Sequence, residues 1–139
     1  MLIDDDSSIS DLVELILITK GFNVRLHPNG SNVQEVVTSY NPDLILLDIM
    51  LPRMDGYNIC QVIRKNMAYR DLPIIMLSGK DGLFDKMRGK LAGSTEYMTK
   101  PFDSVELAQT VKRYLDSPAA RERAARREMQ MHGRLRRQM

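Results

Sequence analysis

Cysteine and long apolar runs are scarce in this sequence of 139 residues. The single cysteine, Cys60, cannot form an internal disulfide and leaves no cysteine set for a zinc site. The longest apolar runs, Leu44–Leu47 and Ile74–Leu77, are far shorter than the roughly 18 residues that a transmembrane helix requires. The opening residues MLIDDD lack the basic and apolar regions of a signal peptide. These absences predict a cytoplasmic protein without a membrane span.

Glycine and proline are also few, 14 of the 139 residues together, while 43% of the chain is hydrophobic and 27% is charged. This balance is typical of a globular protein, and the length predicts one domain. The formal net charge of +2 is uneven: residues 1–117 carry −3, whereas residues 118–139 carry +5 from seven arginines and two glutamates. We therefore expect a mildly acidic domain over residues 1–117. Residues 118–139 form a basic tail, which we expect to be helical but solvated and frayed.

Short apolar segments alternate five times with segments of helical spacing. The expected strands lie at residues 2–3, 24–26, 44–47, 74–77 and 97–98, and helices after the first strand are expected near residues 9–20, 31–39, 56–66, 83–92 and 104–116. The two clearest strands are continuous aliphatic runs, as expected where helices cover both faces of a parallel sheet. The pattern predicts an α/β fold with five parallel strands.

Two of these helices have predicted apolar faces. The first is expected to begin after Ser8, with Asp11 completing a pair similar to a capping box. Its predicted apolar stripe consists of Ile9, Leu12, Val13 and Ile16. In the last helix, opened by Asp103 or Ser104, the predicted apolar side consists of Val105, Ala108, Val111 and Leu115.

Candidate site residues lie just after four of the predicted strands. They are Asp4, Asp5 and Asp6 after the first strand, Asp48 after the third, Ser78 and Gly79 after the fourth, and Lys100 and Pro101 after the fifth. The carboxyl ends of parallel strands meet at one edge of the sheet, where ligands bind. Asp6 alone is interpreted as a turn residue facing water.

Carboxylates that meet at such an edge need a cation. Two unit charges 4 Å apart interact by about 4 kcal/mol at an effective dielectric of 20. Mg²⁺, which prefers a few carboxylates together with water and phosphate oxygens, fits Asp4, Asp5 and Asp48. Lys100 and Ser78 are placed to bind phosphoryl oxygens, and Gly79 offers a backbone N–H. Asp48, the one carboxylate on a different strand, is the predicted phosphoryl acceptor.

Four blocks in this order, LIDDD, LLDIMLPRMDGY, PIIMLSGKDG and EYMTKPF, resemble the receiver domain of two-component response regulators over roughly residues 1–116. The resemblance implies a CheY-like (βα)₅ fold with strand order 2-1-3-4-5. It also implies phosphorylation of Asp48, and Mg²⁺ held by Asp4, Asp5, Asp48 and the Met50 carbonyl. Tyr97 matches the family's switch aromatic, and the peptide bond before Pro101 is expected to be cis. The longer runs PRMDGYNICQVIRKN and SGKDGLFDKMRGKLAGSTEYMTKPF are similar to single-domain, PilG-type regulators of type IV pilus twitching motility.

The sequence departs from the family pattern in three places. Only three residues precede the acids, so the start at Met1 is interpreted as trimmed or misassigned. Met50 and Lys80 stand where the family tunes water access to the acyl phosphate, and we expect Met50 to shield it. The basic tail of residues 118–139 lies outside the family pattern, and the resemblance implies no role for it.

The leading interpretation is a phosphorylation switch rather than an enzyme. The implied partners are a histidine kinase or phosphotransfer protein and an effector protein at the face formed by the fourth helix, the fifth strand and the fifth helix. Formation of a homodimer stays open, and no specific nucleic acid is expected. The alternatives are the receiver fragment of a longer regulator, for example one that binds DNA, and a Mg²⁺-dependent aspartyl phosphatase. A phosphatase commonly carries a second acid two residues after the nucleophile, where this chain has Met50.

Overall fold

The computed structural model describes residues 1–5, 7–49, 55–79 and 82–138. Five strands form one parallel sheet in the order β2-β1-β3-β4-β5. The strands are β1 (Leu2–Ile3), β2 (Leu26–His27), β3 (Ile45–Asp48), β4 (Ile74–Ser78) and β5 (Glu96–Thr99). The predicted α/β fold and its strand order are confirmed. The second strand begins two residues later than predicted.

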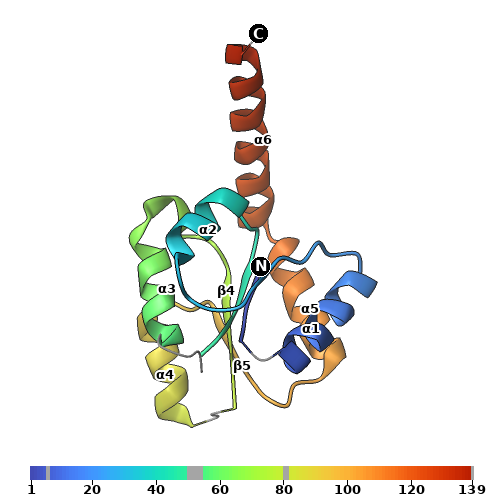
Figure 1. Ribbon diagram of the computed structural model, residues 1–139, viewed down its shortest axis with the longest axis vertical. Coiled ribbons are helices and arrows are strands. Elements are labelled where there is room, and N and C mark those ends of the chain that lie inside the picture. The colour runs from blue at the N-terminus through green and yellow to red at the C-terminus, as the bar shows by residue number, and fades with distance from the viewer. Residues whose placement is uncertain (6, 50–54, 80–81, 139) are drawn as a thin grey trace.

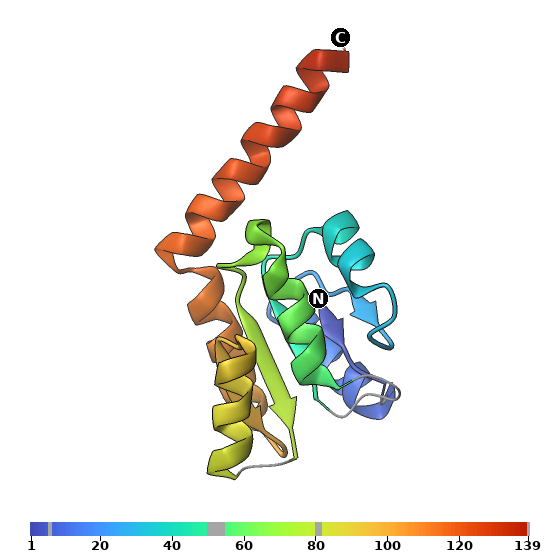
Figure 2. The same ribbon diagram turned by 90° about the vertical axis from the view of Figure 1, so that its left-hand side faces the viewer.

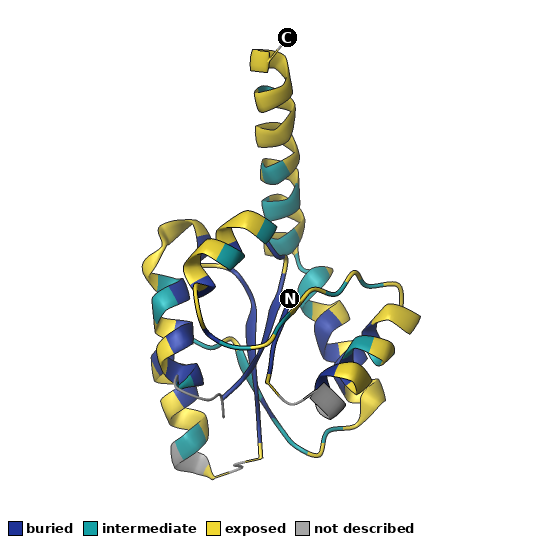
Figure 3. Ribbon diagram, in the orientation of Figure 1, coloured by how far each residue is buried: buried dark blue, intermediate teal, exposed yellow. Residues whose placement is uncertain are grey.

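Helices cover both faces of this sheet (Figure 1). On one face lie α1 (Ser7–Thr19) and α5 (Ser104–Leu115), and on the other lie α2 (Val33–Tyr40), α3 (Gly56–Lys65) and α4 (Leu83–Ala92). Successive residues of a strand point to opposite faces. Ile45 and Leu47 therefore join the core beneath α2 and α3, whereas Leu46 joins the core beneath α1 and α5. Both faces of the central strands are buried (Figure 3), which explains their unbroken apolar runs.

The predicted apolar stripes of α1 and α5 need correction. Helix α1 begins at Ser7, so Ser8 lies inside the helix instead of preceding it. Val13 and Leu17 are buried, whereas Leu12 is 55% exposed. In α5, Val105 is also 55% exposed and Leu107 is buried in its place. In each helix the spacing of apolar residues is compatible with either of two neighbouring faces being buried. Only one of these faces packs against the sheet. The Ile9 side chain lies outside the described part of the chain.

A short 3₁₀ helix, η1 (Met67–Tyr69), follows α3 and was not predicted. Arg64, near the end of α3, holds this region to the sheet. Its Nη1 donates to the carbonyl oxygens of Leu72, 2.6 Å away, and Tyr69, 2.7 Å away, and its Nε donates to that of Gly93 over 2.9 Å. Burial lowers the pKa of Arg64 below its usual range. One side chain thus joins the segments that lead into β4 and β5.

The basic tail forms a long helix, α6 (Pro118–Gln138), which projects from the domain (Figures 1 and 2). Proline suits the first position of a helix because no hydrogen bond of its nitrogen is lost there. The Ser117 hydroxyl accepts from the Ala120 N–H at 3.2 Å and caps the first turn. No residue of α6 is fully buried among those described. The domain boundary between residues 117 and 118 stays a prediction.

Two arginines nevertheless fix the first half of α6 against the domain. The Arg123 guanidinium lies 5.1 Å from the centre of the Tyr69 ring. Arg127 donates to the carbonyl oxygen of Asn41 over 2.5 Å and forms an ion pair with Asp43.

Within the described ranges, no helix combines the length and apolar character that crossing a bilayer demands.

Candidate functional site

Three carboxylates converge at the carboxyl end of the sheet. Strand β1 pairs with β3 so that Ile3 lies beside Leu47, which brings the next residues, Asp4 and Asp48, together. Asp5 joins them, and one carboxylate oxygen from each of the three residues lies within 4.8 Å of the others. Asp4 and Asp48 are buried, whereas Asp5 is exposed. The cluster is therefore a partly enclosed acidic site that opens to solvent on the Asp5 side.

Lys100 reaches this cluster from the end of β5. Its Nζ lies 3.5 Å from Oδ2 of Asp48. Its backbone N–H donates to the Ser78 carbonyl oxygen over 2.6 Å, which places the end of β4 beside the end of β5. The Lys100–Pro101 peptide bond is cis. Ser78 is completely buried, and Gly79, which follows it, is exposed.

Gly56, at the start of α3, is positioned by the strand that carries Asp48. Its N–H donates to the Ile49 carbonyl oxygen over 3.1 Å. A Cβ at this position would lie 2.6 Å from the Ile49 Cα and 2.8 Å from the Asp48 carbonyl oxygen. The backbone after Asp48 can pack this closely only because residue 56 is glycine. Sequence reasoning gave Gly56 no role beyond its place in the MDGY motif.

Tyr97 is half-buried on β5 and lies beneath α4. A Cβ on Gly89 of α4 would lie 3.1 Å from the Tyr97 ring, so this glycine lets helix and ring approach. The side chain of Tyr97 is hydrogen bonded to Tyr57, and burial together with this bond raises the pKa of Tyr57 to about 12. The sequence indicated Tyr97 but not Tyr57, because nothing in a sequence reveals which hydroxyls of two distant tyrosines meet.

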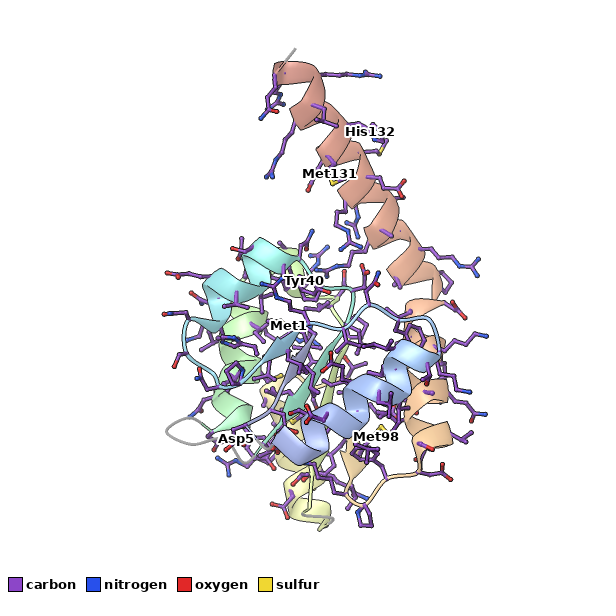
Figure 4. The ribbon with its side chains drawn as sticks, turned by 45° about the vertical axis from the view of Figure 1, so that its right-hand side comes forward. Met1, Asp5, Tyr40, Met98, Met131 and His132 are labelled. Atoms are coloured by element: carbon purple, nitrogen blue, oxygen red, sulfur yellow. The ribbon has the colours of Figure 1, made fainter. Side chains whose placement is uncertain are left out.

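Some expected features lie outside the described residues. They are Met50, with its carbonyl and its shielding thioether, and also Lys80 and Asp6. Of the remaining expected site residues, Asp4, Asp5, Asp48 and Lys100 are brought together at one end of the sheet. Ser78 and Gly79 lie at the end of the neighbouring strand, and Tyr97 faces α3 and α4. Figure 4 shows Asp5 at the end of the domain opposite to Tyr40 and α6.

The donor set fits a hard divalent cation. Carboxylate oxygens are the protein ligands that Mg²⁺ prefers, and it usually retains several waters. Three carboxylates within 4.8 Å, two of them buried, repel one another unless a cation compensates them. Lys100 supplies one positive charge. Asp4, Asp5 and Asp48 are the described residues able to hold the metal ion.

Comparison with known proteins gives a consistent result. Residues 1–112 match the sequence model of the response regulator receiver domain. Protein PilG of Pseudomonas aeruginosa is 41% identical over 117 residues, which cover 84% of this chain and 87% of PilG. The DNA-binding dual master transcriptional regulator RpaA of Synechocystis is 39% identical over 115 residues, or 83% of this chain and 48% of RpaA. The crystal structure of chemotaxis protein CheY4 of Vibrio cholerae superposes with a TM-score of 0.77 at 29% identity, covering 82% of this chain and 95% of CheY4.

Proposed function

Since the chain belongs to the response regulator receiver domain family, we propose that it accepts a phosphoryl group on Asp48 from a histidine kinase or phosphotransfer protein. Receiver domains are phospho-accepting signalling switches rather than enzymes acting on a foreign substrate. The observation that carries the assignment of Asp48 is its position among two other carboxylates and a lysine, with Lys100 Nζ 3.5 Å from Oδ2.

The transfer is a displacement at phosphorus. One oxygen of Asp48 forms the new bond while the bond from phosphorus to the donor's imidazole nitrogen breaks, and the electron pair returns to that nitrogen. Asp4, Asp5 and Asp48 would hold Mg²⁺, with the Met50 carbonyl as a further ligand implied by the family. A metal ion held there would neutralise charge on the phosphoryl oxygens. Lys100 pairs with a phosphoryl oxygen on the other side and stabilises the acyl phosphate.

The signal then passes from Asp48 to the surface through the ends of β4 and β5. The Ser78 hydroxyl and the Gly79 N–H donate to the phosphoryl group, and Tyr97 turns inward as the end of β4 moves. Because Gly89 lets α4 rest on the Tyr97 ring, this movement alters the face formed by α4, β5 and α5. An effector protein binds that face. Shifting the two conformations from 1:99 to 99:1 takes about 5.5 kcal/mol, which a dianionic group held by Lys100 and a metal ion can supply.

The biological response that we propose is control of motility. It rests on the identity of 41% with PilG over 84% of this chain and 87% of PilG. The 83% of this chain that matches RpaA corresponds to 48% of that DNA-binding regulator. A receiver that belongs to a longer regulator is therefore the second candidate.

The acceptor assignment is tested by phosphorylation with acetyl phosphate and Mg²⁺, followed by intact-protein mass spectrometry. The wild type should gain the mass of one phosphoryl group, and EDTA should prevent it. Asp48→Asn should gain none. The matched control Asp11→Asn, which removes an exposed carboxylate of α1, should behave as the wild type. Undiminished labelling of Asp48→Asn refutes the assignment, and sustained turnover of a phosphomonoester by the wild type would favour the phosphatase.

A further inference from the structure

A basic groove lies between α6 and the domain, at the end of the sheet opposite to the acidic cluster. Its volume is about 600 Å³, and it is lined by α6, the end of α2 and the segment around η1. Five arginines line it: Arg70, Arg123, Arg126, Arg127 and Arg134. Figure 4 shows Tyr40 and Met131, two further lining residues, far from Asp5. The groove is therefore separate from the phosphorylation site.

The helical spacing of α6 places four of these arginines on one side. Positions 126 and 127 follow position 123 by three and four residues, and position 134 follows position 127 by seven, so the four share a face. Arg121 and Arg136 lie on other faces and do not line the groove. Four of the seven arginines of the tail therefore line the groove, and the domain contributes Arg70 to the facing wall.

The four arginines of α6 that line the groove divide into two groups. Arg123 and Arg127 hold α6 to the domain through Tyr69, Asn41 and Asp43. Arg126 and Arg134, by contrast, are exposed and have no hydrogen bond or ion pair with any described residue. The three contacts of the first group fix the direction of the helix, so Arg126 and Arg134 stand at fixed places along the groove. These two guanidinium groups are available to an external anion.

Apolar side chains accompany the available charges. Met67 of η1 is 68% exposed, and Met131 of α6 is 61% exposed, and both line the groove. Methionine side chains adapt to irregular partners and recur on protein-binding surfaces. The groove thus presents positive charge and adaptable apolar surface together.

We propose that this groove binds an acidic amphipathic helical segment of a partner protein. Arg126 and Arg134 are eight residues apart, or about 12 Å along the helix axis. Carboxylates seven or eight residues apart on a partner helix can pair with both, and an apolar residue between them can contact Met67 and Met131. Charge complementarity and this mixture of side chains define the occupant.

Other anionic partners fit less well. Single-stranded nucleic acid is normally bound by stacking bases on open aromatic rings. The rings of the groove, Tyr69 and Tyr40, already face the guanidinium groups of Arg123, 5.1 Å away, and Arg25, 5.5 Å away. A flat lipid surface cannot enter a groove to reach arginines on its walls. A helical peptide satisfies both the shape and the composition.

The test uses the full chain and a fluorescent helical peptide with two glutamates eight residues apart and leucines between them. At low salt, Arg126→Gln with Arg134→Gln should weaken binding about tenfold. The matched pair Arg121→Gln with Arg136→Gln removes the same charge from the other faces of α6 and should change affinity less than about threefold. Glutamine is a good helix former, so α6 should persist in both variants, as circular dichroism can verify.

Reversing the charge at positions 126 and 134 provides a second test. Arg126→Glu with Arg134→Glu should lose the glutamate peptide and gain binding of a peptide with lysines at the same two positions. Asp48→Asn should bind the glutamate peptide as the wild type does, which separates this proposal from the phosphorylation proposal. Equal loss in the two glutamine pairs, or equally tight binding of a single-stranded oligonucleotide, would overturn it. A dimer that the groove variant abolishes would assign the groove to a second copy of the chain instead.

Discussion

The Tyr57 hydroxyl, in the first turn of α3, donates to the backbone carbonyl oxygen of Asp85 in α4 over 3.3 Å. The same hydroxyl is hydrogen bonded to Tyr97 on β5. The Arg88 guanidinium lies 4.3 Å from the centre of the Tyr57 ring and pairs with Asp55, the N-cap of α3, at 2.8 Å. Tyr57 thus joins the segment after the Asp48 strand to α4 and to the proposed switch aromatic.

We expect the hydrogen bond between Tyr57 and Tyr97 to stabilise the unphosphorylated conformation, because it holds Tyr97 toward α3 and α4. Tyr57→Phe removes the hydroxyl and should tighten the binding of beryllofluoride with Mg²⁺ by about three- to tenfold, the value of one hydrogen bond. Isothermal titration calorimetry measures the change. Tyr114→Phe, which removes a hydroxyl of α5 that donates to Glu96 of β5 over 2.5 Å, is the control. An unchanged affinity in Tyr57→Phe would show that the tyrosine pair does not bias the switch.

Much of the fold could be predicted because its signals are local. The apolar runs at Leu44–Leu47 and Ile74–Leu77 became the central strands, and the acids after the first and third strands came together because parallel strands end at one edge. The apolar spacing of α1 and α5 predicts Leu12 and Val105 in the core, yet both side chains are exposed. Each helix has more apolar residues than its buried face can hold.

Other features depend on contacts between distant residues and leave no periodic signal. Arg64 binds carbonyl oxygens as far away as Gly93, and Arg127 reaches Asn41 across 86 positions of sequence. The composition of the tail indicated a solvated helix, yet it could not reveal that Arg123 and Arg127 fix the helix against the domain. Side chains that donate to backbone carbonyls can use almost any carbonyl, so no residue type marks the partner.

The acidic cluster of Asp4, Asp5 and Asp48 should lower the free energy of unfolding when no metal ion is bound. Asp5→Asn removes one of three carboxylates that lie within 4.8 Å of one another. In EDTA we expect its free energy of unfolding to exceed that of the wild type by about 1 kcal/mol, since like charges repel and Asp5 is partly screened by solvent. Urea unfolding with and without Mg²⁺ measures the effect.

Added Mg²⁺ should then distinguish the two proteins. At 100 times its dissociation constant, a ligand that binds only the folded state stabilises it by about 2.7 kcal/mol. The wild type should show such a gain, and Asp5→Asn should show much less. Asp11→Asn, on the exposed side of α1, should respond as the wild type. A destabilised Asp5→Asn protein in EDTA would contradict the predicted repulsion.

Gly56 should tolerate no side chain. Gly56→Ala places a Cβ 2.6 Å from the Ile49 Cα and 2.8 Å from the Asp48 carbonyl oxygen, both backbone atoms. We expect a loss of at least about 2 kcal/mol in the free energy of unfolding, together with slower labelling of Asp48. Gly133→Ala in α6 meets no atom within 4 Å and should be neutral or stabilising by up to about 1 kcal/mol. Equal effects of the two substitutions would disprove the close packing.

Cys60 should react only when the protein unfolds. The side chain is completely buried on α3, and burial raises the pKa of its thiol to about 11. Alkylation by iodoacetamide at pH 8 should therefore proceed at the rate of unfolding and accelerate in urea. Between about pH 9 and 11 the folded state holds this proton and the unfolded state releases it, so the free energy of unfolding should fall as pH rises, by up to about 1.4 kcal/mol per pH unit from this group. Cys60→Ala should show a shallower fall over the same window. Rapid alkylation of the native protein would show that the thiol is accessible and would remove the basis for this pH dependence.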